Sequence, residues 1–247
     1  MAHFGMVIDL DRCIGCRACM EACKIENNTP QASFWMYVFR FEEGEYPDTK
    51  ITFLPRPCQH CENPPCVKVC PVGARFRRDD GIVLTDFERC IGCRYCVVAC
   101  PYGVNSFNWK DPKENYYLDW TDSDEGPATD GAVPPWRNPD LQIVHGEEER
   151  LTAGGGHFKG VVEKCTFCVQ RVEKGLDPAC VTTCPVRALV FGDLDDSHSE
   201  VSQYHQNREH FRLLEETGAE PSVIYVGGNP PTTESREIER VDTEVKA

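Results

Sequence analysis

The sequence predicts an α+β fold built from duplicated units with long loops and one insertion. Three observations lead to this prediction. The sixteen cysteines of the 247-residue chain fall into four groups of four, with none left over. The groups alternate between two spacing types along the chain, which indicates an internal duplication. Short apolar stretches before two of the groups are typical of strands.

Groups of the first type form a repeat without gaps. Residues 6–23, MVIDLDRCIGCRACMEAC, align with residues 83–100, VLTDFERCIGCRYCVVAC, at an offset of 77. The alignment matches all four cysteines, the Ile-Gly pair between the first two, and an Asp and an Arg before them. In each copy the apolar start predicts a strand, and residues 96–100 predict the start of a helix.

Groups of the second type also resemble each other. They are CQHCENPPCVKVCPVGA at residues 58–74 and CTFCVQRVEKGLDPACVTTCPVRA at residues 165–188. Both contain CxxC, then a gap of variable length, then CxxxCPV. The order along the chain is therefore type one, type two, type one, type two, and a duplicated architecture explains it better than chance.

Three kinds of chemistry compete for these thiols. Disulfides are disfavoured because CxxCxxC triplets place neighbouring thiols where several pairings would be strained. Structural zinc is disfavoured because two CxxC pairs complete a zinc site and leave no role for a third cysteine in the loop. Iron–sulfur clusters fit, because CxxCxxCxxxC followed by proline binds [4Fe–4S] clusters in bacterial two-cluster ferredoxins. The predicted units are therefore bacterial two-cluster ferredoxin-like units.

The likeness to ferredoxins implies a swapped set of ligands for each cluster. Three cysteines of one run bind a cluster together with the last cysteine of the other run. At four cysteines per cluster, the chain is predicted to bind four [4Fe–4S] clusters. The predicted ligand sets are Cys13, Cys16, Cys19 and Cys184; Cys23, Cys165, Cys168 and Cys180; Cys58, Cys61, Cys66 and Cys100; and Cys70, Cys90, Cys93 and Cys96.

The cysteine groups also suggest where the units begin and end. Groups two and three are neighbours in sequence and form one unit, whereas groups one and four meet across the chain. The predicted divisions are residues 1–50 and 158–195 for a discontinuous first unit, 51–105 for the second unit, 106–157 for an insertion, and 196–247 for a C-terminal extension.

The insertion and the extension carry no motif with known chemistry. The insertion is interpreted either as a surface excursion packed by its own aromatic residues or as a docking surface for a partner. In the extension, residues 208–217 predict a helix, residues 222–228 predict a strand, and the charged end is predicted to be disordered. The notable residues of the insertion are Trp109, Tyr116, Tyr117, Trp120, Trp136 and three glycines at 154–156.

Charge and motifs narrow the class of function. The net charge of −14 argues against nucleic-acid binding, which needs a basic face. No GxSxG, HExxH or Rossmann fingerprint is present, so we expect a non-catalytic protein that conducts electrons. Arg17, Arg94 and Lys164 are interpreted either as solvated charges or as cations that raise cluster potentials. His60 is interpreted as a spacer, because the cysteines already complete the ligand count.

The cysteine motifs together resemble the iron–sulfur subunit of the dimethyl sulfoxide reductase superfamily of molybdopterin oxidoreductases. The resemblance covers about residues 3–105 and 158–227. The chain is most similar to the respiratory arsenate, polysulfide and tetrathionate reductase type, and three segments are most similar to the arsenate reductase type. They are FGMVIDLDRCIGC, CKIENNT and FGDLDDSHSEVSQ.

This resemblance implies a set of partners and a location. The partners would be a catalytic subunit with a molybdenum or tungsten pterin cofactor and, in many members, a membrane subunit that reacts with quinones. The expected location is the periplasm or the outer face of the membrane, reached by co-export with a signal-bearing partner; the alternative is the cytoplasm. Alternative functions are the iron–sulfur subunit of an alternative complex III or nitrite reductase assembly, and a free polyferredoxin carrier.

Overall fold

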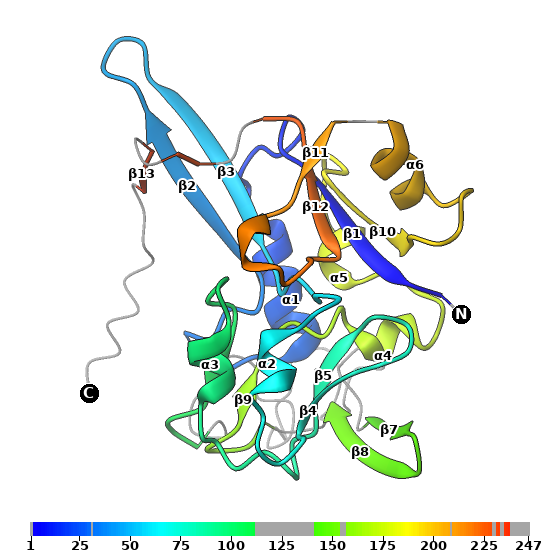
Figure 1. Ribbon diagram of the computed structural model, residues 1–247. Helices are drawn as coiled ribbons and strands as arrows, with labels where there is room; N and C mark the ends of the chain where they lie inside the picture. The colour runs from blue at the N-terminus through cyan, green and yellow to red at the C-terminus, as the bar shows by residue number, and fades with distance from the viewer. Residues whose placement is uncertain are drawn as a thin grey trace, which may run out of the picture.

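Strand β1 (Phe4–Asp9) lies inside the larger sheet of the computed structural model (Figure 1). It pairs antiparallel with β10 (Leu189–Asp193) and parallel with β12 (Val223–Val226), and β11 (His210–Phe211) extends the sheet beyond β12. The structure describes residues 2–30, 32–111, 141–153, 157–207, 209–228, 231–232 and 235–237.

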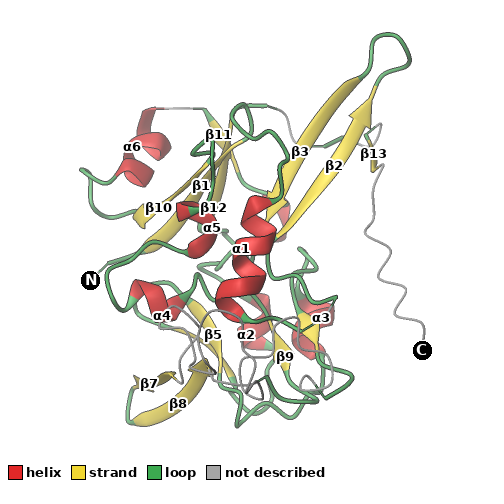
Figure 2. Ribbon diagram, turned by 180° about the vertical axis from the view of Figure 1, so that it is seen from behind, coloured by secondary structure: helices red, strands yellow, loops and turns green. Residues whose placement is uncertain are grey.

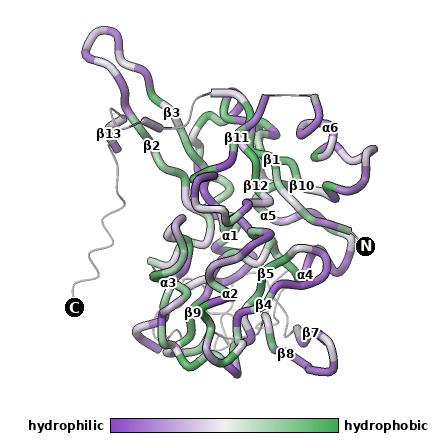
Figure 3. Tube along the Cα trace, viewed as in Figure 1, coloured by the Kyte–Doolittle hydropathy of each residue, from purple (hydrophilic) through white to green (hydrophobic). Residues whose placement is uncertain are grey.

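The β1 sequence alternates between two apolar environments. Met6 and Ile8 face the core that also contains the cysteines, whereas Val7 packs with Val201 of helix α6 (Glu200–Asn207) on the other face. Because both faces of β1 are covered, three successive apolar residues are fully buried. Figure 3 shows hydrophobic colour along β1 and the neighbouring strands of this sheet.

A second, smaller strand pair repeats the arrangement of β1 and β10. Strands β4 (Arg75–Arg77) and β5 (Val83–Thr85) pair antiparallel. Each pair consists of the strand before a type-one group and the strand after a type-two group. Helices α1 (Ala18–Asn27) and α3 (Tyr95–Ala99) follow the type-one CxxC loops, and the one-turn helices α2 (Pro65–Lys68) and α5 (Ala179–Thr182) lie inside the type-two groups.

Helix α1 lies across the middle of the molecule when it is viewed from behind (Figure 2). It packs against α5, while α2 packs against α3 in the other half. The remaining short helices are α4 (Val169–Val172) and the 3₁₀ turn η2 (Glu215–Thr217). We call the part with groups one and four the first half and the part with groups two and three the second half. Within each half, the helix of the type-one group packs against the helix of the type-two group.

A long hairpin projects from this body (Figure 1). Its strands are β2 (Tyr37–Glu43) and β3 (Lys50–Arg56), and β13 (Arg236–Glu237) pairs with the outer side of β2. The rings of Tyr37, Phe39 and Phe41 follow one another along one face of β2. The hairpin crosses the predicted boundary between residues 50 and 51, and the division into units stays a prediction.

The described part of the insertion packs on the second half. Its hairpin consists of β7 (Leu141–His145) and β8 (Glu148–Ala153). Leu151 of β8 accepts a backbone hydrogen bond from Phe87 at 2.8 Å, and the Arg150 guanidinium lies 4.5 Å from the centre of the Phe76 ring. Strands β6 (Ser106–Phe107) and β9 (Val162–Glu163) close the insertion at its base.

The predicted elements are partly confirmed. The strands before both type-one groups, the helix near residues 96–100 and the strand in 222–228 are present. Of the helix predicted at 208–217, only the 3₁₀ turn η2 at Glu215–Thr217 is present. His210 and Phe211 instead pair with β12, Leu214 has a φ of 51°, and the regular helix α6 ends before this segment.

Other expectations fall outside the described residues. They concern Tyr116, Tyr117, Trp120, Trp136, the glycines at 154–156 and residues 238–247 of the charged C-terminal end. At the start of that end, Arg236 and Glu237 pair with β2. Among the described residues, the helices are all too short or too polar to cross a membrane.

We predict that Gly92→Ala destabilises the protein more than Gly175→Ala does. Both glycines have positive φ, 68° and 71°, so both substitutions introduce similar backbone strain. A Cβ at Gly92 would lie 2.2 Å from the Gly160 carbonyl oxygen, whereas a Cβ at Gly175 would meet nothing within 4 Å. The free energy of unfolding of Gly92→Ala should fall by about 1–3 kcal/mol more, measured by anaerobic denaturant titration. Equal losses would contradict this packing.

Candidate iron–sulfur site

The two CxxC loops of the type-one groups have the same backbone conformation. Gly15 and Arg17 have φ of 66° and 63°, and Gly92 and Arg94 have φ of 68° and 62°. In each loop, two of the five residues from the first cysteine to the arginine have positive φ, and they turn the chain tightly. The three cysteines of each loop therefore line one cavity. Both copies place an arginine in this costly region, which indicates that the loop shape is required.

An aspartate anchors each loop to its strand. The backbone N–H of Cys13 donates to the carbonyl of Asp9 at 3.1 Å, and the Asp9 carboxylate lies 3.6 Å from Arg12 Nε. In the second copy Cys90 donates to the Asp86 carbonyl at 3.2 Å, and Asp86 pairs with Arg89 at 3.2 Å. These are the Asp and Arg that the repeat aligns, and they hold the first cysteine of each loop.

Three of the four predicted cysteine sets each line one cavity. The three cavities are similar in size. Their cysteines are Cys70, Cys90, Cys93 and Cys96; Cys58, Cys61, Cys66 and Cys100; and Cys13, Cys16, Cys19 and Cys184. Each cavity therefore contains cysteines of both group types, as the swapped arrangement requires.

The remaining four cysteines also lie together. The charges of Cys23, Cys165 and Cys168 act on one another and on Cys180, and all four side chains are buried. Asn27, at the end of α1, has its Nδ2 3.6 Å from the sulfurs of both Cys23 and Cys168. This amide links a type-one cysteine to a type-two cysteine across the fold.

The two halves meet at equivalent positions of their type-two CxxC loops. The ring of His60 stacks on the ring of Phe167 with centroids 3.7 Å apart and planes 24° apart. Both residues occupy the third position of their CxxC sequences and both have positive φ. Cys58 and Cys165, the first cysteines of these loops, are electrostatic neighbours.

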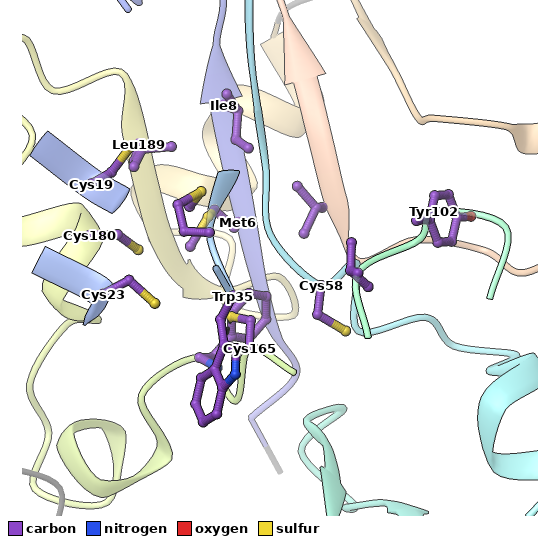
Figure 4. Packing of buried hydrophobic residues seen from close by; sticks show 14 of the residues in the cluster. Met6, Ile8, Cys19, Cys23, Trp35, Cys58, Tyr102, Cys165, Cys180 and Leu189 are labelled. Atoms are coloured by element: carbon purple, nitrogen blue, oxygen red, sulfur yellow. Dashed lines mark hydrogen bonds between the residues drawn. The ribbon is translucent and has the colours of Figure 1, made fainter. Parts of the chain in front are cut away.

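The four sets form a row through the protein. Figure 4 shows the first part of it, from Cys19 and Cys180 through Cys23 and Cys165 to Cys58. In the second half, Arg75 joins the next two sets, because its charge acts on both Cys66 and Cys96. The row thus begins at the Cys13 set and ends at the Cys70 set.

Burial of the cysteines follows their place in the row. In the two middle sets, every cysteine except Cys100 is buried. The two exposed cysteines, Cys16 and Cys93, belong to the first and last sets and are equivalent in the repeat. Both ends of the row therefore approach the protein surface, whereas its middle is shielded from water.

The buried thiols are weak acids. Burial, together with the charges of Cys58 and Cys168, raises the pKa of the Cys165 thiol to about 12. Burial is also the main cause that raises the pKa of Cys19 to about 12 and that of Cys66 to about 11. Such thiols lose their proton at neutral pH only when a metal binds the thiolate. A high pKa therefore suits a metal ligand, whereas a nucleophilic cysteine needs a low pKa.

The donor set fits a cluster better than a single ion. Within the described ranges, no three His, Cys, Asp or Glu side chains converge closely enough to hold one metal ion. The sulfurs instead surround a cavity, as ligands to the separate iron atoms of a cubane do. All sixteen cysteines lie in the described part of the chain, and none forms a disulfide there.

The other predicted residues have distinct surroundings. Arg94 lies over the rings of Phe107 and Trp109 at the exposed end of the row, whereas Lys164 is buried and lines the Cys58 cavity. His60 accepts a hydrogen bond at Nδ1 from the Val83 backbone at 3.0 Å. This bond occupies one ring nitrogen and fits the interpretation of His60 as a spacer.

Two residues beside the sulfurs were not identified from the sequence. Asn27 follows the type-one group by four residues, and nothing in its surroundings distinguishes it from other amides. Arg75 is the first residue after CPVGA, whereas the equivalent CPVRA is followed by Leu189. An arginine at the start of a strand whose equivalent is apolar was therefore a visible signal.

A buried histidine supports the Asn27 contact. Nε2 of His157 lies 2.9 Å from the Asn27 carbonyl oxygen, and Nδ1 lies 2.8 Å from the Glu163 carboxylate. Both partners are acceptors, so both ring nitrogens donate only when His157 is protonated. Burial alone would lower the pKa of His157, but Glu163 and the backbone acceptors raise it overall.

We predict that His157 stabilises the fold in a pH-dependent way. Because its pKa is raised on folding, its contribution is complete below the usual value of 6.5 and is lost as the pH rises through the raised pKa. At acidic pH, His157→Gln should lower the free energy of unfolding by about 1–3 kcal/mol, and the deficit should shrink at alkaline pH.

The measurement is anaerobic denaturant unfolding of both proteins across this pH range. His198→Gln, on an exposed turn, is the control and should change little at any pH. A deficit that is the same at every pH would show that the histidine acts through packing alone.

Comparison with known proteins gives the family. Profiles of the 4Fe-4S dicluster domain match residues 6–74 and, in another match, residues 49–115 and 156–194. The chain is 43% identical over 241 residues to a putative dimethyl sulfoxide reductase iron-sulfur subunit of Halobacterium salinarum, covering 92% of this chain and 80% of the relative. It is 42% identical over 234 residues to the arsenate respiratory reductase iron-sulfur subunit of Shewanella sp., covering 91% and 96%.

A third relative gives the same assignment. The chain is 39% identical over 230 residues to a tetrathionate reductase subunit of Salmonella typhimurium, covering 91% of this chain and 72% of the relative. The matched segments contain all the cysteine groups. The chain therefore belongs to the iron–sulfur subunits of the dimethyl sulfoxide reductase family, and it carries four [4Fe–4S] clusters.

Proposed function

We propose that this chain relays electrons between a molybdopterin-containing catalytic subunit and a quinone-reactive membrane subunit or another redox partner. The observation that carries the proposal is the row of four cysteine sets, shielded in the middle and exposed at both ends. When bound, each [4Fe–4S] cluster takes up and releases one electron. The chain itself supplies the ligands, the spacing and the exclusion of water.

The ligand sets that we propose are the four sets described above, each with one cysteine from the opposite group type. Three sets line matched cavities, and the fourth lies between them in the row. Backbone donors lie close to two of these sulfurs: Ala188 N–H lies 3.2 Å from Cys184 Sγ, and Phe167 N–H lies 3.4 Å from Cys165 Sγ. Hydrogen bonds to ligand sulfurs stabilise the reduced, more negative state.

An apolar patch at the Cys93 end favours a docked partner over a free carrier. Ile91, Tyr95 and Val98 expose 64%, 62% and 86% of their surfaces around Cys93, and Trp109 lies nearby beneath Arg94. At the other end Ile14, the repeat equivalent of Ile91, is 58% exposed beside Cys16. Apolar surface gathered around an exposed ligand is typical of an interface that another subunit covers.

The location follows from the partners in this proposal. A catalytic subunit with an export signal would carry this chain, already folded, to the outer face of the membrane. The catalytic subunit would bind one end of the row of cysteine sets, and the membrane subunit would bind the opposite end. Purification of the native complex should therefore yield this chain together with a pterin protein, and a chain that purifies alone with all its clusters would support a free carrier.

We predict an iron content of about 16 atoms per chain after anaerobic purification, because four clusters contain four iron atoms each. The measurement is iron and zinc analysis combined with EPR of the reduced protein. A content near four zinc atoms with little iron would contradict the cluster assignment.

Paired substitutions test which cysteines share a cluster. Cys96→Ser with Cys70→Ser removes two ligands of one proposed set and should leave about 12 iron atoms. Cys96→Ser with Cys100→Ser removes one ligand from each of two sets and should leave about 8.

Val98→Ser is the control, because this exposed side chain lies between Cys96 and Cys100 without being a ligand. It should retain the full iron content. If both double variants kept some iron but lost the same amount, the proposed partition would be wrong. If both lost all their iron, the same pairs are compared by EPR in the intact complex, where equal loss of cluster signals would contradict the partition.

A further inference from the structure

Arg75 is a buried cation in contact with ligand sulfurs of the second half. Its side chain is 2% exposed, and its Nη2 lies 3.4 Å from Cys96 Sγ. Its backbone N–H lies 3.4 Å from Cys70 Sγ, so both parts of the residue address the same cavity. The guanidinium charge also acts on Cys66 and Cys58, which belong to the adjacent set.

No carboxylate compensates this charge within the described part of the chain. Arg75 forms no ion pair there, and its Nε and Nη1 atoms are buried without a hydrogen-bond partner. A buried cation without a counter-charge is costly. The negative charge that compensates Arg75 must therefore be the thiolates and the clusters that they bind.

The other half has no such cation at the equivalent position. Aligning CPVGA with CPVRA places Arg75 opposite Leu189, and each residue lines the corresponding cavity of its half. Buried lysines do not create the same difference, because each half has one: Lys24 next to Cys23, and Lys164 at the Cys58 cavity. Arg75 is thus a buried cation in contact with ligand sulfurs, at a position where the other half has an apolar residue.

We propose that Arg75 raises the reduction potentials of the two clusters in the second half and so makes the duplicated halves of the relay electrically inequivalent. Reduction adds negative charge to a cluster, and a fixed cation in a buried environment stabilises that added charge strongly. Arginine remains protonated at all physiological pH values, so the effect is permanent and does not depend on pH. The inference rests on the proposed function, because it assumes that the two cysteine sets hold clusters.

The test compares uncharged and charged substitutions at this position. Arg75→Met removes the charge and the donors, Arg75→Gln removes the charge but keeps donors, and Arg75→Lys keeps the charge. Arg77→Met is the matched control, because it removes a cation from the same strand whose guanidinium instead pairs with Glu62 at 2.5 Å. Each full-length protein is purified anaerobically, analysed for iron, and titrated redox-potentiometrically with EPR detection.

We expect both uncharged variants to lower two of the four midpoint potentials and leave the other two unchanged. For the cluster of the Cys70 set, the equilibrium constant for reduction should fall at least tenfold, which is about 59 mV for a one-electron couple. Arg75→Lys and Arg77→Met should shift each midpoint much less.

Other outcomes separate this inference from the proposed function. Four clusters with unchanged midpoints in Arg75→Met and Arg75→Gln would overturn the inference and leave the relay intact. If only Arg75→Lys assembled about 16 iron atoms, the charge would be required for assembly instead of tuning, and the inference would be wrong as stated. A wild-type protein without clusters would overturn the proposed function itself.

Discussion

The bond between a cysteine thiolate and iron is the interaction on which this fold depends. Burial raises the pKa values of the Cys19, Cys66 and Cys165 thiols, and metal binding to their thiolates is coupled to folding of the core around them. Each proposed set takes its fourth ligand from a distant group. Ligation therefore ties the N-terminal segment to the segment after the insertion, and the insertion can vary without breaking that tie.

Much of this arrangement could be predicted from the sequence, because a loop that binds a cluster requires a fixed spacing between its cysteines. The offset of 77 residues identified two equal loops, and the structure gives them equal φ angles and equal Asp–Arg anchors. The β1–β10 and β4–β5 ladders join the segments of groups one and four and of groups two and three, which are the pairs that the prediction places in one unit. The fold class was predictable for the same reason.

Features without a fixed spacing could not be predicted. The helix expected at 208–217 has suitable propensity, but β12 offers an open edge that His210 and Phe211 complete instead. The projecting β2–β3 hairpin contains no cysteine, so no spacing pattern in the sequence indicated it. Asn27 and Arg75 act through tertiary contacts, and only the comparison of Arg75 with Leu189 in the repeat could have indicated one of them.

The stacked rings of His60 and Phe167 show that the two copies of the repeat meet at equivalent positions. Contact between equivalent positions is what a two-fold, self-complementary interface produces. Both copies belong to one chain, so their sequences need not be the same at this contact. One copy places a histidine there and the other a phenylalanine, and the contact is therefore symmetric in position but not in chemistry.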